Sequence, residues 1–175
     1  MDRHLDKLKQ ALQSAIADMS NAQLLWHPQE KWCAAEILEH LYLTYTGTTK
    51  GFQKVLQAGA PPTLHPSLKQ RWQILVVNGF HYLPTGRKSP PMAQPKGLPL
   101  EKVKNEFENK IAEMDVVIAD CEARFGKRVR LLNHPVLGPL TGQQWRKFHL
   151  VHGLHHEKQL LQLRDAVFTA PAQPA

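Results

Sequence analysis

The chain has 175 residues, 42% of them apolar and 21% charged, which indicates one globular domain and excludes a disordered or collagen-like sequence. No apolar run approaches the roughly 20 residues of a membrane-spanning helix, and the charged N-terminus is not a signal peptide, so we expect a cytoplasmic protein with no membrane partner. The net charge is +7, and residues 40–100 account for all of it, because they hold seven basic and no acidic side chains. This basic segment favours an anionic partner.

The first half of the chain predicts two long helices and a shorter one. Residues 2–19 repeat apolar side chains at steps of three and four, the period of an amphipathic helix. A second long helix is expected over residues 34–58, because Cys33 and Glu36 have the spacing of a capping box and Gly59 follows as a stop. Residues 66–80 predict the shorter helix.

The second half predicts two more long helices. Residues 84–99 contain five prolines and two glycines and predict an ordered crossover or a mobile lid without secondary structure. Helical spacing then runs over 100–125, and Thr141 is positioned to cap a last helix that ends near Phe168. His134-Pro135 and Gly138-Pro139 are turn signals, no alternating strand pattern is present, and residues 169–175 predict a disordered tail.

These elements predict an all-α fold, a four-helix bundle with a short extra helix and a proline-rich crossover, in one domain over residues 1–168. The last helix has a second apolar stripe, which another element of the chain or the second subunit of a homodimer would cover. The stripe consists of Leu150, Leu154 and Leu161.

Histidines supply the strongest chemical signal. His152 and His156 lie one helical turn apart, the spacing by which two histidines share a metal ion, although a solvated pair would have the same spacing. His40, midway along the second long helix, is the candidate third ligand. Three imidazoles with open positions are typical of a catalytic metal; zinc is favoured by availability, and nickel and iron(II) are alternatives because imidazole suits them all.

The surroundings of these histidines leave several interpretations open. We expect His134, His149 and His155 to be structural or to support the ligands, whose second ring nitrogens need acceptors. The acceptors nearest in sequence are Glu36, Glu157 and Gln159.

Small residues share the face of His40, and Cys33 lies two turns before it. Gly47 and Gly51 indicate either close helix packing or a cavity for a ligand, since glycine inside a helix costs roughly 1 kcal/mol. Cys33 is either a plain cap or a thiol activated at a helix N-terminus, and it forms no disulfide framework with Cys121.

Two segments resemble the signature regions of the DinB/YfiT-like superfamily. They are KWCAAEILEHL at 31–41 and HLVHGLHHEKQL at 149–160, while HPVLGPLT at 134–141 with Trp145 is similar to a branch of that superfamily of unknown function. The resemblance implies an up-down-down-up bundle and a divalent metal held by three histidines, here His40, His152 and His156. The sequence departs from the pattern at Cys33, where the family has Ser or Thr.

The resemblance also suggests a function. Characterised members of the superfamily include transferases and isomerases that use thiols such as mycothiol or bacillithiol, whose thiolate the metal stabilises. We therefore expect a metal-dependent enzyme, a thiol-dependent S-transferase with a small anionic or thiol substrate, although no catalytic side chain stands out. The alternative is a non-enzymatic, stress-related bundle with a structural or vestigial metal site; nucleic-acid binding is disfavoured because no aromatic platform or recognition helix is present.

Overall fold

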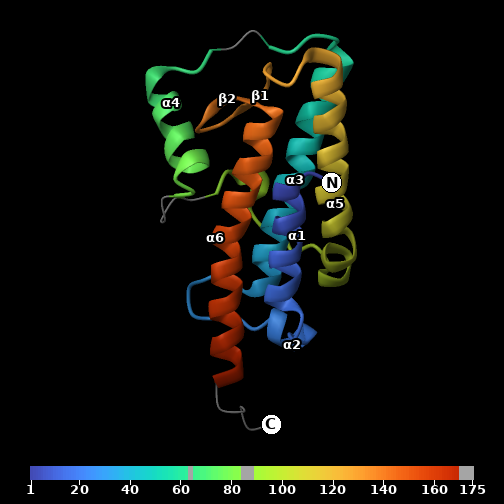
Figure 1. Ribbon diagram of the computed structural model, residues 1–175. Helices are drawn as coiled ribbons and strands as arrows, with labels where there is room; N and C mark the ends of the chain where they lie inside the picture. The colour runs from blue at the N-terminus through green and yellow to red at the C-terminus, as the bar shows by residue number, and fades with distance from the viewer. Residues whose placement is uncertain (63–64, 84–88, 170–175) are drawn as a thin grey trace.

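Helices form most of the structure, a computed structural model that describes residues 1–62, 65–83 and 89–169 (Figure 1). The long helices are α1 (Arg3–Ile16), α3 (Ala34–Ala58), α5 (Leu100–Phe125) and α6 (Gly142–Thr169). The short segments are α2 (Asn21–Leu24), α4 (Leu68–Ile74), the π-helical η1 (Leu75–Gly79) and the 3₁₀ turn η2 (Pro91–Ala93). The expectation of a predominantly helical chain is confirmed. In Figure 1, α3 and α5 run in one direction while α1 and α6 run in the opposite one.

The prediction of a fold without strands is wrong in one place. Residues Arg130–His134 (β1) and Gly138–Thr141 (β2) pair as an antiparallel hairpin at the end of the molecule where α6 begins (Figure 1). β2 is buried at three successive positions, so no alternating pattern marks it in the sequence. The hairpin packs against α3 and α6, and this tertiary contact rather than local periodicity stabilises it. The predicted turn does lie between the two strands.

The four long helices share one core. α1 packs along α6, and α3 packs along α5. The α1–α6 contact is close, since a Cβ atom added at Gly153 would overlap the side chain of Leu8. Within the single chain Leu150 is buried, and Leu154 and Leu161 are partly buried against the core. A homodimer across that stripe stays a prediction.

Element boundaries follow the capping signals. Asp2 caps α1, which ends at Ile16, three residues before the predicted end, because α2 follows with its own Ser20 cap. At the start of α3, Glu36 accepts a hydrogen bond from the Cys33 backbone N–H at 2.9 Å. Thr141 and Gln144 cap α6 reciprocally.

The described part of the proline-rich segment is an ordered crossover, one of the two predicted alternatives, while its residues 84–88 lie outside the described residues. The prediction that it lacks secondary structure is wrong at Pro91–Ala93, which form the 3₁₀ turn η2. Of the predicted tail, Thr169 ends α6 and residues 170–175 lie outside the described residues as well. Within the described ranges, no helix combines the length and apolar character needed to cross a membrane.

Candidate metal centre

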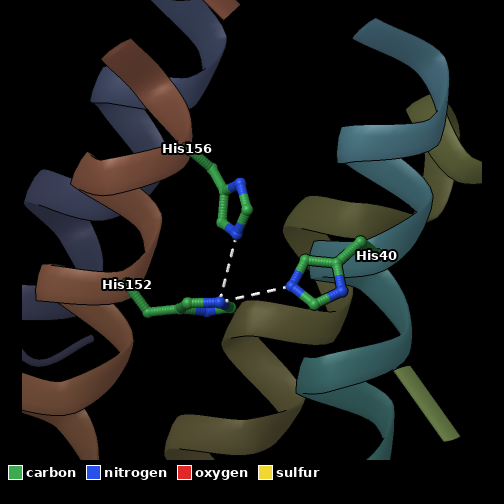
Figure 2. Close-up of side chains that lie close together, drawn as sticks. All are labelled: His40, His152 and His156. Atoms are coloured by element: carbon green, nitrogen blue, oxygen red, sulfur yellow. Dashed lines mark hydrogen bonds between the residues drawn. The ribbon is translucent and has the colours of Figure 1, made fainter. Parts of the chain in front are cut away.

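The structure brings the three predicted ligands together from two helices. His40 comes from α3, and His152 and His156 come from successive turns of α6 (Figure 2). The Nε2 atom of His152 lies 3.2 Å from the Nε2 atom of His40 and 3.2 Å from that of His156. Two nitrogens bound to one zinc ion at about 2.0–2.1 Å lie roughly 3.3 Å apart at a tetrahedral angle. The separations therefore fit a shared ion.

Hydrogen bonds on the far side of the rings determine where the protons lie. His40 Nδ1 donates to the Ala93 carbonyl oxygen at 2.7 Å, and His156 Nδ1 donates to Gln159 Oε1 at 2.7 Å. Because each neutral ring carries one N–H, both Nε2 atoms present lone pairs toward His152. A proton on His152 Nε2 can satisfy only one of them. A cation between the three nitrogens satisfies all of them, so the donor set fits a divalent metal.

Of the two oxygen atoms that accept hydrogen bonds from the ligand rings, the sequence predicted one and not the other. Gln159 is one of the three predicted acceptors, three residues from the ligand that it orients. Glu36 instead caps α3, and the Ala93 carbonyl, 53 residues from His40, was not predicted. The Nδ1 atom of His152 is buried and has no hydrogen-bond partner within the described ranges.

The carbonyl of Ala93 reaches His40 because a buried carboxylate holds the crossover in place. Glu39, adjacent to His40, is 3% exposed and accepts hydrogen bonds from the backbone N–H groups of Lys96 and Gly97 at 2.7 and 3.1 Å. These bonds attach the segment after η2 to α3. Glu39 is thus a supporting residue that the sequence did not reveal.

Burial keeps the three imidazoles neutral. Desolvation lowers the pKa of His40 below its ordinary value and that of His156 to about 3. Desolvation also lowers the pKa of His152 well below its ordinary value, and the neighbouring histidines lower it further. Near pH 7 protons therefore do not compete with a metal ion for these nitrogens.

Aromatic rings enclose the group. Trp32 lies with its ring centroid 5.3 Å from that of His40, and the Phe148 ring stacks on His152 at 5.5 Å with an interplanar angle of 9°. These contacts restrict the orientation of two ligands and shield one side of the site from water.

A large cavity opens beside the three histidines. Its volume is about 1080 Å³, and it is bounded by α3, α4, η1, η2, the hairpin and α6. Ligand pockets typically measure roughly 300–1,000 Å³. Within the described residues, Lys69 is the only lysine, arginine or carboxylate side chain in its wall. The site therefore has room for an organic molecule next to the ion.

The two glycines of α3 have different explanations. A Cβ atom at Gly51 would lie 2.7 Å from Leu132 Cδ2, so this glycine lets the hairpin pack closely against the helix. A Cβ atom at Gly47 would meet no atom of the described residues within 4 Å, and Gly47 lines the cavity. Close packing explains the first glycine, and open space explains the second.

The other predicted histidines occupy three different environments. Nδ1 of His134 accepts hydrogen bonds from the backbone N–H groups of Val136 and Leu137, both at 3.1 Å, and thereby orders the hairpin turn. His149 is fully buried between Tyr45 and Trp145, and neither of its ring nitrogens has a hydrogen-bond partner within the described ranges. Burial lowers the pKa of His134 to about 4 and that of His149 to about 3. His155 lines the cavity next to the three candidate ligands.

Cys33 is a buried cap in this environment. Its side chain is 1% exposed, and burial raises the pKa of its thiol above the ordinary value. An activated thiol requires a lowered pKa and exposure. The structure therefore favours the plain cap over the reactive thiol.

Comparison with known proteins gives one match. The family model described as the DinB superfamily matches residues 4–160, a span that runs from α1 into α6 and contains all three candidate ligands. No curated protein and no solved structure shows significant similarity to the chain.

Proposed function

Because the chain belongs to the DinB superfamily, we propose that it is a divalent-metal-dependent enzyme and, more narrowly, a thiol-dependent S-transferase. His40, His152 and His156 are the ligands in this proposal, with zinc as the first choice and nickel and iron(II) as alternatives. The four long helices then form the up-down-down-up bundle that the resemblance implies. The observation that supports the proposal most is the convergence of three Nε2 atoms beside a large cavity.

The chemistry follows from the charge of the ligands. A divalent ion on three neutral imidazoles keeps its full positive charge and would stabilise a thiolate by lowering the pKa of the thiol. In the proposed transfer the S–H bond of the thiol would break and its proton would pass to solvent. Sulfur would then bond to a carbon atom of an electrophile, and the leaving group would depart with the bonding electrons.

The protein's own side chains prepare this site. Hydrogen bonds from His40 to Ala93 and from His156 to Gln159 keep both Nε2 lone pairs free and fix both rings. Phe148 stacks on His152 and limits the access of water. The cavity beside the rings leaves space for both the thiol and the electrophile.

Metal analysis tests the proposal directly. Protein loaded with zinc and then desalted should retain one ion per chain, and His40→Ala should weaken zinc binding at least 100-fold. His65→Ala is the matched control, because His65 is an exposed histidine of the described chain that is not one of the three ligands and does not line the cavity; this variant should keep the ion. Wild-type protein without stoichiometric metal, or a His40→Ala variant that retains it, would contradict the proposal.

A second measurement separates the enzyme from a bundle with a structural site. Cobalt(II)-loaded protein should develop a sulfur-to-metal charge-transfer band when a low-molecular-weight thiol is added, because three protein ligands leave a position open. The same protein should accelerate the conjugation of that thiol to an electrophile, and chelation should abolish the acceleration. A cobalt spectrum that no thiol changes would favour the structural site.

A further inference from the structure

The chemistry of the cavity wall defines a class of ligand. Apolar side chains come to this wall from every side, including Leu43 of α3, Val76 of η1, Val136 of the hairpin turn and Phe148 of α6. Lys69 is the one lysine or arginine that the described residues contribute, and none of them contributes a carboxylate. The wall's other polar side chains, such as Thr48, Gln73 and Asn133, are uncharged and are outnumbered by apolar ones. A strongly polar molecule would therefore lose more hydration than these side chains replace. The body of the ligand should therefore be apolar.

The length of the cavity along α3 indicates how far this ligand reaches. Gly47 lies on the same face of α3 as His40, two turns further along, and both line the cavity. At 1.5 Å per residue, seven residues correspond to roughly 10 Å. Gly47 is exposed, and none of the described residues packs against the space above it. A ligand that coordinates the ion can therefore extend along α3 to this glycine.

Exposed apolar side chains continue the wall to the molecular surface. Trp72 of α4 is 63% exposed and Met92 of η2 is 73% exposed, yet both line the cavity. Large apolar side chains that gather at a cavity mouth mark a binding site, because exposing them to water is unfavourable. An apolar surface thus runs from solvent to the three histidines.

We infer that the ligand of this site is a predominantly apolar organic molecule with a single metal-coordinating anionic group at one end. This inference rests on the proposed metal site and specifies the substrate class for it. The anionic end meets the ion held by His40, His152 and His156. The apolar body lies along α3 against the side chains of η1 and the hairpin.

A series of alkyl hydroxamates tests the inference, since the hydroxamate group coordinates zinc and the chain length can be varied. Calorimetric titration of the zinc-loaded full chain should show affinity rising about threefold to fourfold per added methylene while the chain remains in the cavity. Octanohydroxamate should therefore bind at least 100-fold more tightly than acetohydroxamate. Equal affinity for the two would overturn the inference while leaving the metal site intact.

Two variants locate the apolar chain. Gly47→Leu fills the open space on α3 and should weaken octanohydroxamate binding at least 10-fold while leaving acetohydroxamate binding unchanged. Gln53→Leu is the matched control, because it adds the same side chain to an exposed position of α3 outside the cavity. Should Gly47→Leu not fold, Met92→Glu at the exposed mouth should weaken the long chain selectively.

The possible results distinguish the two proposals. Zinc content is measured first, and protein that binds no zinc would contradict the proposed function together with this inference. Zinc-loaded protein that does not discriminate by chain length, or a Gly47→Leu variant that binds octanohydroxamate as wild type does, would overturn only the ligand class. Long-chain preference that is lost in Gly47→Leu and kept in Gln53→Leu supports it.

Discussion

The position of one hydrogen on each imidazole determines what these histidines can do. His40 and His156 each donate from Nδ1 to an oxygen, so their Nε2 atoms are acceptors that need a cation or a donor. His134 has the opposite arrangement, because its Nδ1 accepts two backbone hydrogen bonds and its proton must lie on Nε2. The same residue type thus provides candidate metal ligands on the helices and orders the hairpin turn.

His149 makes the stability of the protein sensitive to acid. Burial lowers its pKa to about 3, so the folded chain binds fewer protons than the unfolded chain, in which the pKa is about 6.5. Stability that is present above pH 6.5 is therefore lost as the pH falls toward 3. In zinc-free protein, His149→Phe should reduce the loss of unfolding free energy between pH 7 and pH 5 by about 1–2 kcal/mol.

Urea unfolding at the two pH values measures this effect. At pH 7 the variant should be no less stable than wild type, because both nitrogens of His149 are buried without a partner in the described structure. His65→Phe, a substitution of an exposed histidine, is the control and should leave the pH dependence unchanged. An identical pH dependence in His149→Phe and wild type would show that His149 does not contribute.

At the scale of the elements, two glycines inside helices show that the same residue type can have different structural roles. Gly153 of α6 lies against Leu8 of α1, and an added Cβ atom would overlap that side chain. Gly47 of α3 faces open space. Helical propensity favours alanine over glycine in both helices, so only the surroundings distinguish the two positions.

The same substitution at these positions should therefore have opposite effects. Gly47→Ala should raise the free energy of unfolding by about 0.5–1 kcal/mol, because alanine is the better helix former and no atom of the described residues obstructs its methyl group. Gly153→Ala should lower it by about 1–3 kcal/mol, because the buried side chain of Leu8 must shift to make room for the added methyl group. Thermal and urea unfolding of the two variants measure the difference, and a stabilised Gly153→Ala would contradict the close α1–α6 contact.

The crossover shows how a connection whose described residues form only the short 3₁₀ turn η2 contributes to the site. Its prolines and glycines disfavour an α-helix, but Glu39 anchors its Lys96 and Gly97 N–H groups on α3. The anchored segment presents the carbonyl of Ala93 to His40. The crossover therefore orients the candidate metal ligand His40 although its described residues contain no α-helix.

In the whole molecule, the candidate metal centre joins helices that are far apart in the sequence. His40 of α3 and His152 of α6 are 112 residues apart, so an ion bound to both cross-links the fold. A ligand that binds only the folded state, at a free concentration 100 times its dissociation constant, raises the free energy of unfolding by about 2.7 kcal/mol. For a chain of this size, the melting temperature should rise by about 5–10 °C on zinc loading.

Differential scanning calorimetry with and without a chelator checks this stabilisation. His40→Ala should melt at one temperature under both conditions, whereas His65→Ala, at an exposed histidine, should show the full wild-type difference. A wild-type melting temperature that does not respond to zinc would contradict binding between α3 and α6.

The sequence by itself determined the long helices and the identity of the three histidines. Apolar periodicity, the capping spacing of Cys33 and Glu36, the Thr141 cap and the stop at Gly59 are local signals, because helix formation depends mainly on residues within one or two turns. The spacing of His152 and His156 is local for the same reason. His40 was a candidate from the face that it occupies on its helix and from the resemblance of its segment to a known family.

Tertiary structure decided the remaining features. β2 is too short and too uniformly buried to show a strand pattern, and it exists because β1 and α6 pack against it. The Ala93 carbonyl, the enclosing Phe148 ring and the cavity at Gly47 depend on which segments meet across the fold. Sequence patterns record the requirements of each element, whereas hydrogen-bond partners and empty space arise only when elements pack against one another.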